Sequence, residues 1–384
     1  MHYLEEINMS TMLQPHTTGP YAVGSTNLQV SPKFTNIGDE AMHHYLLGTS
    51  VSAQHPHYIA DLLQFPELAW VTHVEVPQQT ALYGTASGKS LPVVSFLTYP
   101  TIKKQFPNSY AFPYHDSAYG LFEHMLGIDE SPHFAEQSRR YPLIILAHGA
   151  AAHGIYEVEH AHKLASHGYI VAVLFYGDER YVNADNSYAY AGFLRPLITQ
   201  AVLDSILQSD TFGPHVDSDN IGISGHSFGG FTSLALAGGK IQDQADSVSD
   251  PRFTAAVIAA PYVGHYEQGK EVFAFGDNNM GLRSVSIPVL TLFGTKDEST
   301  LASFILPATE QLSGPTYVVE LVDQAHIFEP SSWQDKENWE MLFFNAYLKH
   351  DKQAQEGLKH GLSMHGGNED LQRLEFQRAQ CRVR

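Results

Sequence analysis

From about residue 140 onward, short apolar runs rich in β-branched residues alternate with longer segments of helical spacing. The apolar runs are residues 142–147, 169–176, 220–224, 255–260, 288–293 and 317–322. Helices are expected between them at about 155–167, 191–208, 228–238 and 298–312, and a last one at about 333–348. Such alternation is typical of βαβ units, whose strands form a mostly parallel sheet covered by helices on both faces. The sequence therefore predicts the α/β fold class.

The chain before residue 140 follows a different pattern. Residues 70–76 and 91–99 have the length and spacing of strands, and the glycine-containing turn at 84–88 separates them. We expect these two strands to form an antiparallel extension of the sheet. The aromatic segment 103–135 is too rich in turn-forming residues for a regular element. It is interpreted either as a lid over a site or as an aromatic surface loop.

A chain of 384 residues is compatible with one elaborated domain. We assign residues 1–68 to an N-terminal extension, 69–350 to the main domain and 351–384 to a C-terminal tail. The tail is polar, and Gly361, Gly366 and Gly367 interrupt any continuous helix there. Two interpretations of the tail stay open: it is mobile, or it docks on a second subunit in a homodimer.

Composition limits the partners of this chain. The formal charge of 22 − 41 = −19 disfavours nucleic acid and anionic surfaces. No apolar run is long enough to span a bilayer, so no membrane insertion is expected. The single Cys381 cannot form an intrachain disulfide. Residues 1–20 lack the features of a secretory signal, which favours a cytoplasmic location, although a secreted chain with its signal removed would look the same.

The most specific motif is Gly225-His226-Ser227-Phe228-Gly229, which matches G-x-S-x-G. It follows a short apolar run and precedes a helical segment, the context that a nucleophile elbow requires. Glycine at both ends of the motif permits a sharp turn that lifts the serine hydroxyl to the start of a helix. We therefore predict that Ser227 is a nucleophile. The alternative is a glycine-rich turn that only packs tightly.

A serine hydroxyl needs a base, and in folds of this kind an acid and then a histidine follow the serine along the chain. Asp297 follows the apolar run 288–293, and His326 follows the run 317–322, which is 326 − 297 = 29 residues after the acid. Both lie where strands are expected to end, at the edge that carries chemistry in such sheets. Asp297 could instead cap the next helix, and Glu298 and Asp323 are reserve acids.

An oxyanion formed during attack by Ser227 needs hydrogen-bond donors. The backbone amide of Phe228, the residue after the nucleophile, is the first expected donor. The second is the amide of Ala150, which follows the glycine in His148-Gly149-Ala150-Ala151. His148 itself is interpreted as a brace for this loop.

Histidine is abundant, with 22 residues, and His160 and His162 suggest a metal pair. Residues two apart on a helix do not face each other, and no third ligand has metal-binding spacing. We therefore expect no metal and no cofactor.

These motifs together resemble one branch of the α/β hydrolases, which holds dienelactone-hydrolase-like enzymes, platelet-activating-factor acetylhydrolases and cutinase-like polyester hydrolases. The resemblance covers roughly residues 85–350. It rests on Leu146-Ala147-His148-Gly149, on Leu164-Ala165-Ser166-His167-Gly168-Tyr169-Ile170-Val171, on 225–230, on 288–297 and on Ala325-His326. The early stretch Gly19-Pro20-Tyr21-Ala22-Val23-Gly24 is similar to the start of the acetylhydrolase and polyester-hydrolase domains.

The resemblance implies a serine carboxylic-ester hydrolase that works through an acyl-enzyme. It also implies that Tyr262, which follows Pro261, stacks on the acyl part of the substrate; a buried structural tyrosine is the alternative. The chain departs from the branch in three ways. Serine replaces the cysteine of true dienelactone hydrolases, no terminal disulfide can form, and the insertion 103–135 has no recognised counterpart.

The aromatic loops favour short-chain or aromatic esters as substrates. An acetylhydrolase or phospholipase-like activity and a polyester hydrolase are the alternatives among enzymes, and a peptidase is disfavoured because no repeat domain precedes the hydrolase part. A non-catalytic ligand-binding homologue is the alternative of another class.

Overall fold

The structure is a computed structural model that describes residues 12–13, 16–27, 58–63, 69–103, 108–111, 119–122, 124–126, 131–177, 187–241, 248–360, 363–364 and 372–377. The chain forms two compact units. The N-terminal unit is Thr18–Ser218, and the C-terminal unit combines Met1–Thr17 with Asp219–Arg384.

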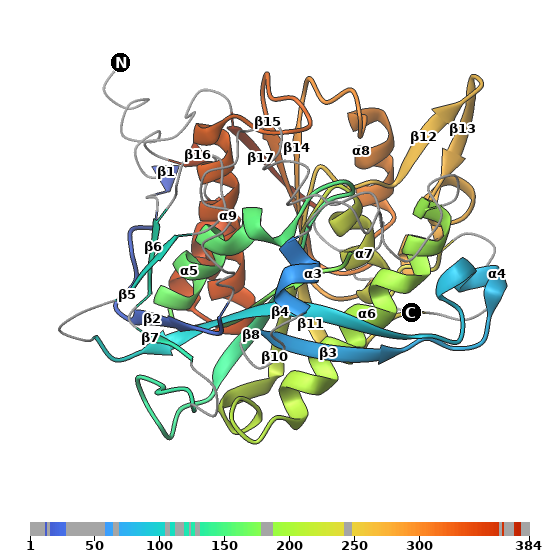
Figure 1. Cartoon of the computed structure of the whole chain (residues 1–384). Helices are drawn as coiled ribbons and strands as arrows, with labels where there is room; N and C mark the ends of the chain where they lie inside the picture. Colours follow the sequence, from blue (N-terminus) through green and yellow to red (C-terminus); the bar gives the residue numbers. More distant parts are fainter. Residues whose placement is uncertain are drawn as a thin grey trace, which may run out of the picture. The chain divides into compact units, whose positions relative to one another are not determined.

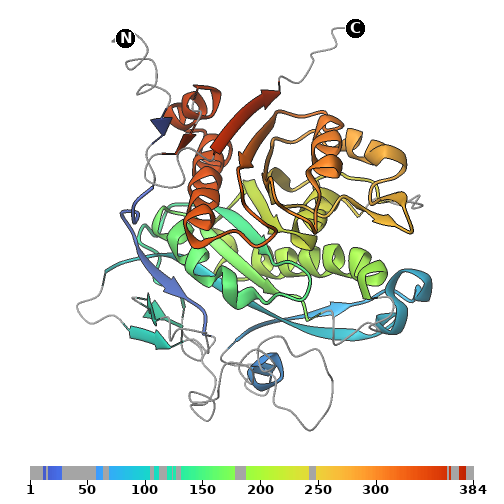
Figure 2. The same cartoon turned by 90° about the horizontal axis from the view of Figure 1, so that it is seen from above.

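The C-terminal unit contains parallel strands in the order β10, β11, β14 and β15, with β17 added antiparallel to β15 (Figure 1). Their bounds are β10 (Val216–His226, most of it in this unit), β11 (Phe253–Ala259), β14 (Val289–Gly294), β15 (Thr316–Leu321) and β17 (Gln372–Gln377). The helices are α7 (Phe228–Leu236), η7 (Asp277–Ser284), α8 (Ala302–Glu310), α9 (Pro330–Leu348) and α10 (Lys352–His360). Figure 2 shows α9 on one side of these strands and α8 on the other.

Two small strand pairs complete this unit. Strands β12 (Gly264–Glu267) and β13 (Lys270–Phe273) form an antiparallel hairpin. Strands β1 (Met12–Leu13) and β16 (Ser363–Met364) pair in parallel.

In the N-terminal unit, β8 (Tyr141–Ala147) is parallel to β9 (Ile170–Phe175), and the long β4 (Ser90–Thr101) is antiparallel to β9. Strands β3 (Trp70–Glu75) and β2 (Ala22–Ser25) both pair antiparallel with β4. The helices are α3 (Tyr58–Leu63), α4 (Thr80–Tyr83), η2 (Gly84–Ala86), η3 (Gly154–Glu157), α5 (Val158–Ser166), α6 (Ser187–Gln208) and η6 (Gly213–His215).

These elements confirm the predicted α/β class, with mostly parallel strands flanked by helices and an antiparallel extension before residue 140. Strands β8, β9 and β14 are buried along their whole length, as expected for parallel strands covered on both faces. Over the described ranges, no helix is long and apolar enough to cross a membrane.

The prediction that segment 103–135 holds no regular element is wrong. Strand β5 (Asn108–Ala111) pairs antiparallel with β6 (Tyr119–Phe122), and β7 (His124–Met125) pairs with β2. Aromatic residues favour strands, and pairing satisfies the backbone polar groups between the turns. Residues 104–107, 112–118, 123 and 127–130 lie outside the described residues, so the lid stays a prediction.

The expected tail, 351–384, also contains regular structure. Helix α10 ends directly before Gly361, as the glycines predict, and β17 extends the sheet at β15. Adding an antiparallel strand supplies partners for the backbone groups at the edge of β15. Sequence alone gave no signal for this pairing, and residues 378–384 lie outside the described residues.

We predict that the buried face of α9 is a major source of stability in the C-terminal unit. Trp339 is fully buried, so Trp339→Ala should lower the free energy of unfolding by about 3–5 kcal/mol. The exposed Gln334 lies on the same helix, and Gln334→Ala should change that free energy by less than about 0.5 kcal/mol. Urea denaturation of both variants checks this, and equal losses would contradict it.

Candidate active site

Ser227 lies at the junction between β10, which ends at His226, and α7, which begins at Phe228. Its backbone has φ 56° and ψ −117°, a conformation that side-chain-bearing residues rarely adopt. A Cβ atom at Gly225 would lie 2.3 Å from the carbonyl oxygen of Gly229. Only glycine at position 225 therefore permits this tight turn, as the sequence motif predicts.

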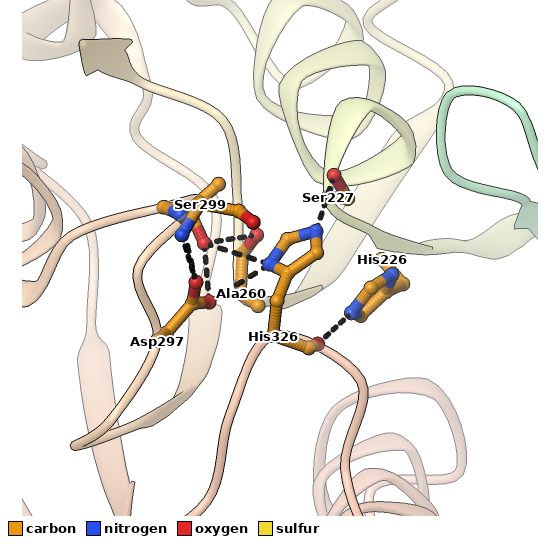
Figure 3. A network of polar contacts seen from close by, with 7 residues as sticks. His226, Ser227, Ala260, Asp297, Ser299 and His326 are labelled. Carbon is orange, nitrogen blue, oxygen red and sulfur yellow. Dashed lines mark hydrogen bonds and ion pairs between the residues drawn. The ribbon is translucent and has the colours of Figure 1, made fainter. Parts of the chain in front are cut away.

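His326 lies between Ser227 and Asp297 (Figure 3). Its Nε2 atom is 3.0 Å from the Ser227 hydroxyl oxygen, and its Nδ1 atom is 2.8 Å from Oδ2 of Asp297. A carboxylate only accepts, so Nδ1 carries the proton, and Nε2 of the neutral ring is left to accept from the serine hydroxyl. The three side chains that the sequence selected in Ser–Asp–His order thus form one hydrogen-bonded chain.

Asp297 performs two tasks with its two oxygens. Oδ1 accepts hydrogen bonds from the amides of Ser299 and Thr300, both at 2.8 Å. Oδ2 accepts from the Thr300 hydroxyl at 2.6 Å and from His326. The capping role and the orienting role, which the sequence analysis treated as alternatives, therefore coexist in one residue.

These hydrogen bonds determine the charge of Asp297. Its side chain is fully buried, and burial alone would raise the pKa of the carboxyl group. The hydrogen bonds from His326 and Thr300 outweigh burial and hold the pKa below its ordinary value of 3.8. Asp297 is therefore a carboxylate at neutral pH.

Thr300 was not selected from the sequence. Its hydroxyl lies 2.6 Å from Asp297 Oδ2, 3.0 Å from the carbonyl oxygen of Ala260 and 3.3 Å from Nδ1 of His326. The signal that could have found it is the spacing Asp-x-x-Thr, because an Asp side chain often bonds backbone amides two and three residues later.

The reserve acids do not take part in this hydrogen-bonded chain. Both Glu298 and Asp323 are exposed, and Asp323 forms an ion pair with Lys296 at 3.0 Å.

His226 is a second histidine at the site that the sequence analysis did not single out. Its Nε2–H group donates to the backbone carbonyl of His326 at 2.8 Å, and its ring lies 4.8 Å from the His326 ring. Phe328 and Trp333 pack against it. Burial, together with the proximity of His326, lowers the pKa of His226 from 6.5 to about 4, so its ring is neutral at neutral pH.

Of the remaining predicted site residues, Phe228 and Tyr262 belong to the C-terminal unit and Ala150 to the N-terminal unit. Phe228 is the first residue of α7, and the ring of Tyr262 lies 6.2 Å from the Phe228 ring. The half-buried Tyr262 also bonds Nδ1 of His265 through its hydroxyl at 2.9 Å, and its amide donates to the Ser227 carbonyl at 3.0 Å. Ala150 follows β8 in the N-terminal unit, so its pairing with the Phe228 amide stays a prediction.

No metal centre emerges in the part of the chain that the structure describes, since no group of three or more His, Cys, Asp or Glu side chains is placed to hold an ion. His160 is buried on α5, and His162 on the same helix is half-buried.

Comparison with protein-family models and with curated proteins finds no match for this chain. The chemistry of the site is therefore inferred from its geometry.

We predict that His226 makes the protein less stable in mild acid. Its pKa is about 4 in the folded protein and 6.5 when unperturbed, so between these values the unfolded chain binds a proton that the folded chain does not. The free energy of unfolding should fall as pH decreases from 6.5 to 4, and His226 should account for up to roughly 3 kcal/mol of that loss.

His226→Gln, which keeps a side-chain donor, should flatten this pH dependence in urea denaturation at pH 4 to 7. His73→Gln, at an exposed histidine of β3, serves as the control and should leave the slope as in the wild type. An unchanged slope in His226→Gln would rule the explanation out.

Proposed function

We propose that this chain is a serine hydrolase of carboxylic esters with the α/β-hydrolase fold. The observation that carries the proposal is the continuous chain of hydrogen bonds from the Ser227 hydroxyl through His326 to Asp297, at 3.0 and 2.8 Å. A hydroxyl within reach of a histidine that an ionised carboxylate orients is the arrangement that activates serine for acyl transfer.

In the proposed reaction, Ser227 attacks the ester carbonyl carbon while Nε2 of His326 accepts the hydroxyl proton. The amides of Phe228 and Ala150 stabilise the oxyanion of the tetrahedral intermediate. His326 then gives its proton to the departing alcohol, which leaves an acyl-enzyme on Ser227. A water molecule, activated by the same histidine, releases the acid and restores the serine.

The groups around His326 support its proposed role in accepting and donating a proton. When His326 gains a proton, the carboxylate of Asp297 faces the ring nitrogen and stabilises the positive charge. Asp297 stays ionised because the amides of Ser299 and Thr300 and the Thr300 hydroxyl stabilise its negative charge. The neutral His226 adds no competing charge beside the imidazolium.

We propose short-chain or aromatic esters as the substrate class. The rings of Phe228, Phe231 and Tyr262 have centroids within 6.2 Å of one another beside the nucleophile loop. The two phenylalanines are buried, so the half-buried Tyr262 is the ring of this cluster that would offer an apolar surface to a small acyl group. The proposed ester hydrolysis requires no cofactor.

We predict that Ser227→Ala loses ester hydrolysis. Turnover of p-nitrophenyl esters from acetate to palmitate should fall at least about 10,000-fold, and labelling by a fluorophosphonate probe should disappear. The remote Ser313, exposed in the same unit, supplies the control Ser313→Ala, which should behave as the wild type. A wild type that neither turns over nor labels would refute the esterase function and favour a ligand-binding protein.

We also predict that Thr300→Val slows the reaction roughly tenfold, the equivalent of one hydrogen bond to a charged group. Without the hydroxyl the pKa of Asp297 rises, since its carboxylate is less well stabilised. The loss of kcat/KM at the lowest pH, where Asp297 titrates, should therefore begin at higher pH in Thr300→Val. Thr300→Ser keeps the hydroxyl and should restore both the rate and the profile, and a Val variant with the wild-type profile would count against the role of Thr300.

A further inference from the structure

The peptide group between Gly149 and Ala150 is held by a buried arginine. Arg195, from α6, is fully buried in the N-terminal unit. Its Nη1 group donates to the carbonyl of His148 at 2.7 Å, and its Nη2 group donates to the carbonyl of Gly149 at 3.2 Å. One guanidinium thus bonds two successive carbonyls of the loop that follows β8.

His148 supplies another hydrogen bond to the same carbonyl. Its Nδ1 atom lies 2.8 Å from the Gly149 carbonyl oxygen, which only accepts, so Nδ1 carries the proton. Its Nε2 atom accepts from the amide of Tyr176 at 3.4 Å. Both ring nitrogens are therefore engaged by one neutral tautomer, which supports the interpretation of His148 as a brace.

Hydrogen bonds at the Gly149 carbonyl act directly on the Ala150 amide, because the two belong to one peptide group. In a trans peptide the C=O and N–H bonds point in opposite directions, and the described residues contain no cis peptide. Two donors on the oxygen side therefore fix the direction of the Ala150 N–H. They also polarise the peptide, which strengthens that N–H as a donor.

The environment of Arg195 indicates that its position is tightly defined. Its guanidinium lies over the ring of Tyr176, 4.6 Å from the centroid. Burying a guanidinium is costly unless its donors are satisfied. Lysine has no planar fork, so it does not reproduce both carbonyl contacts together with the ring contact.

We propose that Arg195 is a positioning residue that holds the Gly149–Ala150 peptide with its N–H presented as an oxyanion donor. The catalytic part of this inference rests on the proposed esterase function, whereas the contact itself does not. In this mechanism Arg195 acts only through the peptide group.

Nuclear magnetic resonance can report selectively on the Gly149–Ala150 peptide group within the whole protein. Gly-Ala occurs once in the sequence, at Gly149-Ala150. Protein labelled with carbonyl-¹³C glycine and ¹⁵N alanine should therefore give a single amide signal correlated to that carbonyl. Hydrogen bonds deshield a carbonyl carbon, so Arg195→Lys and Arg195→Gln should move the Gly149 carbonyl resonance upfield and shift the Ala150 amide.

Kinetics of the same samples tests the catalytic part. Both Arg195 variants should lower kcat for p-nitrophenyl acetate about 10- to 100-fold, less than the roughly 100- to 1000-fold cost of losing an oxyanion donor itself. KM should stay within about threefold, because the oxyanion exists only after attack. The preference for an ester over the matching thionoester should also shrink, since sulfur accepts these hydrogen bonds poorly.

The matched control is Thr199→Val. Thr199 lies on the same helix and in the same buried cluster, bonding the Arg195 carbonyl and Tyr176, but it does not contact the Gly149 carbonyl in this network. Its variant should leave the Gly149 resonance, kcat and the thionoester preference unchanged. Equal losses in Thr199→Val would overturn the proposal, because they would reveal a general packing role.

The other outcomes are also decisive. If the Gly149 carbonyl resonance of the folded Arg195 variants equals that of the wild type, the proposed hold of Arg195 on this peptide group is overturned, even if the wild type is an active esterase. A moved resonance with unchanged kcat overturns the catalytic part alone. A wild type without ester turnover overturns the proposed function, and the resonance still decides the contact. If neither Arg195 variant folds while Thr199→Val does, Arg195 serves the core and the proposal fails.

Discussion

The candidate site depends on the close approach of Gly225 to Gly229. The absence of a side chain at position 225 lets the chain turn directly from β10 into α7, with Ser227 held at φ 56°. The Ser227 amide is bonded to the carbonyl of Ala259 on the neighbouring strand, so the sheet anchors the strained residue. The position of the hydroxyl relative to His326 follows from this backbone constraint.

The site also requires that the buried charge of Asp297 be stabilised. Asp297 is a fully buried carboxylate, and backbone amides, a hydroxyl and an imidazole satisfy its oxygens. His226 meets the opposite requirement, since burial keeps its ring neutral beside His326 while its N–H holds the His326 backbone. In the proposed mechanism, His326 is thereby available for proton transfer, and His226 serves as a neutral support.

Much of this arrangement could be predicted because it is encoded locally. The G-x-S-x-G motif has a direct steric meaning, and Asp297 and His326 were found by their places after apolar runs. Thr300 lies three residues after Asp297, so the local spacing Asp-x-x-Thr could have found it. His226 was missed because its role depends on a contact with the backbone of His326, which is distant in sequence. Arg195 was missed for the same reason, as it lies 46 residues from the Gly149 carbonyl that it bonds.

The sequence by itself determined the α/β class, the turn at Ser227 and the order of serine, acid and histidine, because periodicity and glycine sterics act over a few residues. Tertiary structure alone decided that β17 joins β15, that Asp297 both caps a turn and faces His326, and that Arg195 bonds the loop before Ala150. Each of these depends on hydrogen-bond partners brought together from separate elements. Their geometry exists only after the strands and helices have packed.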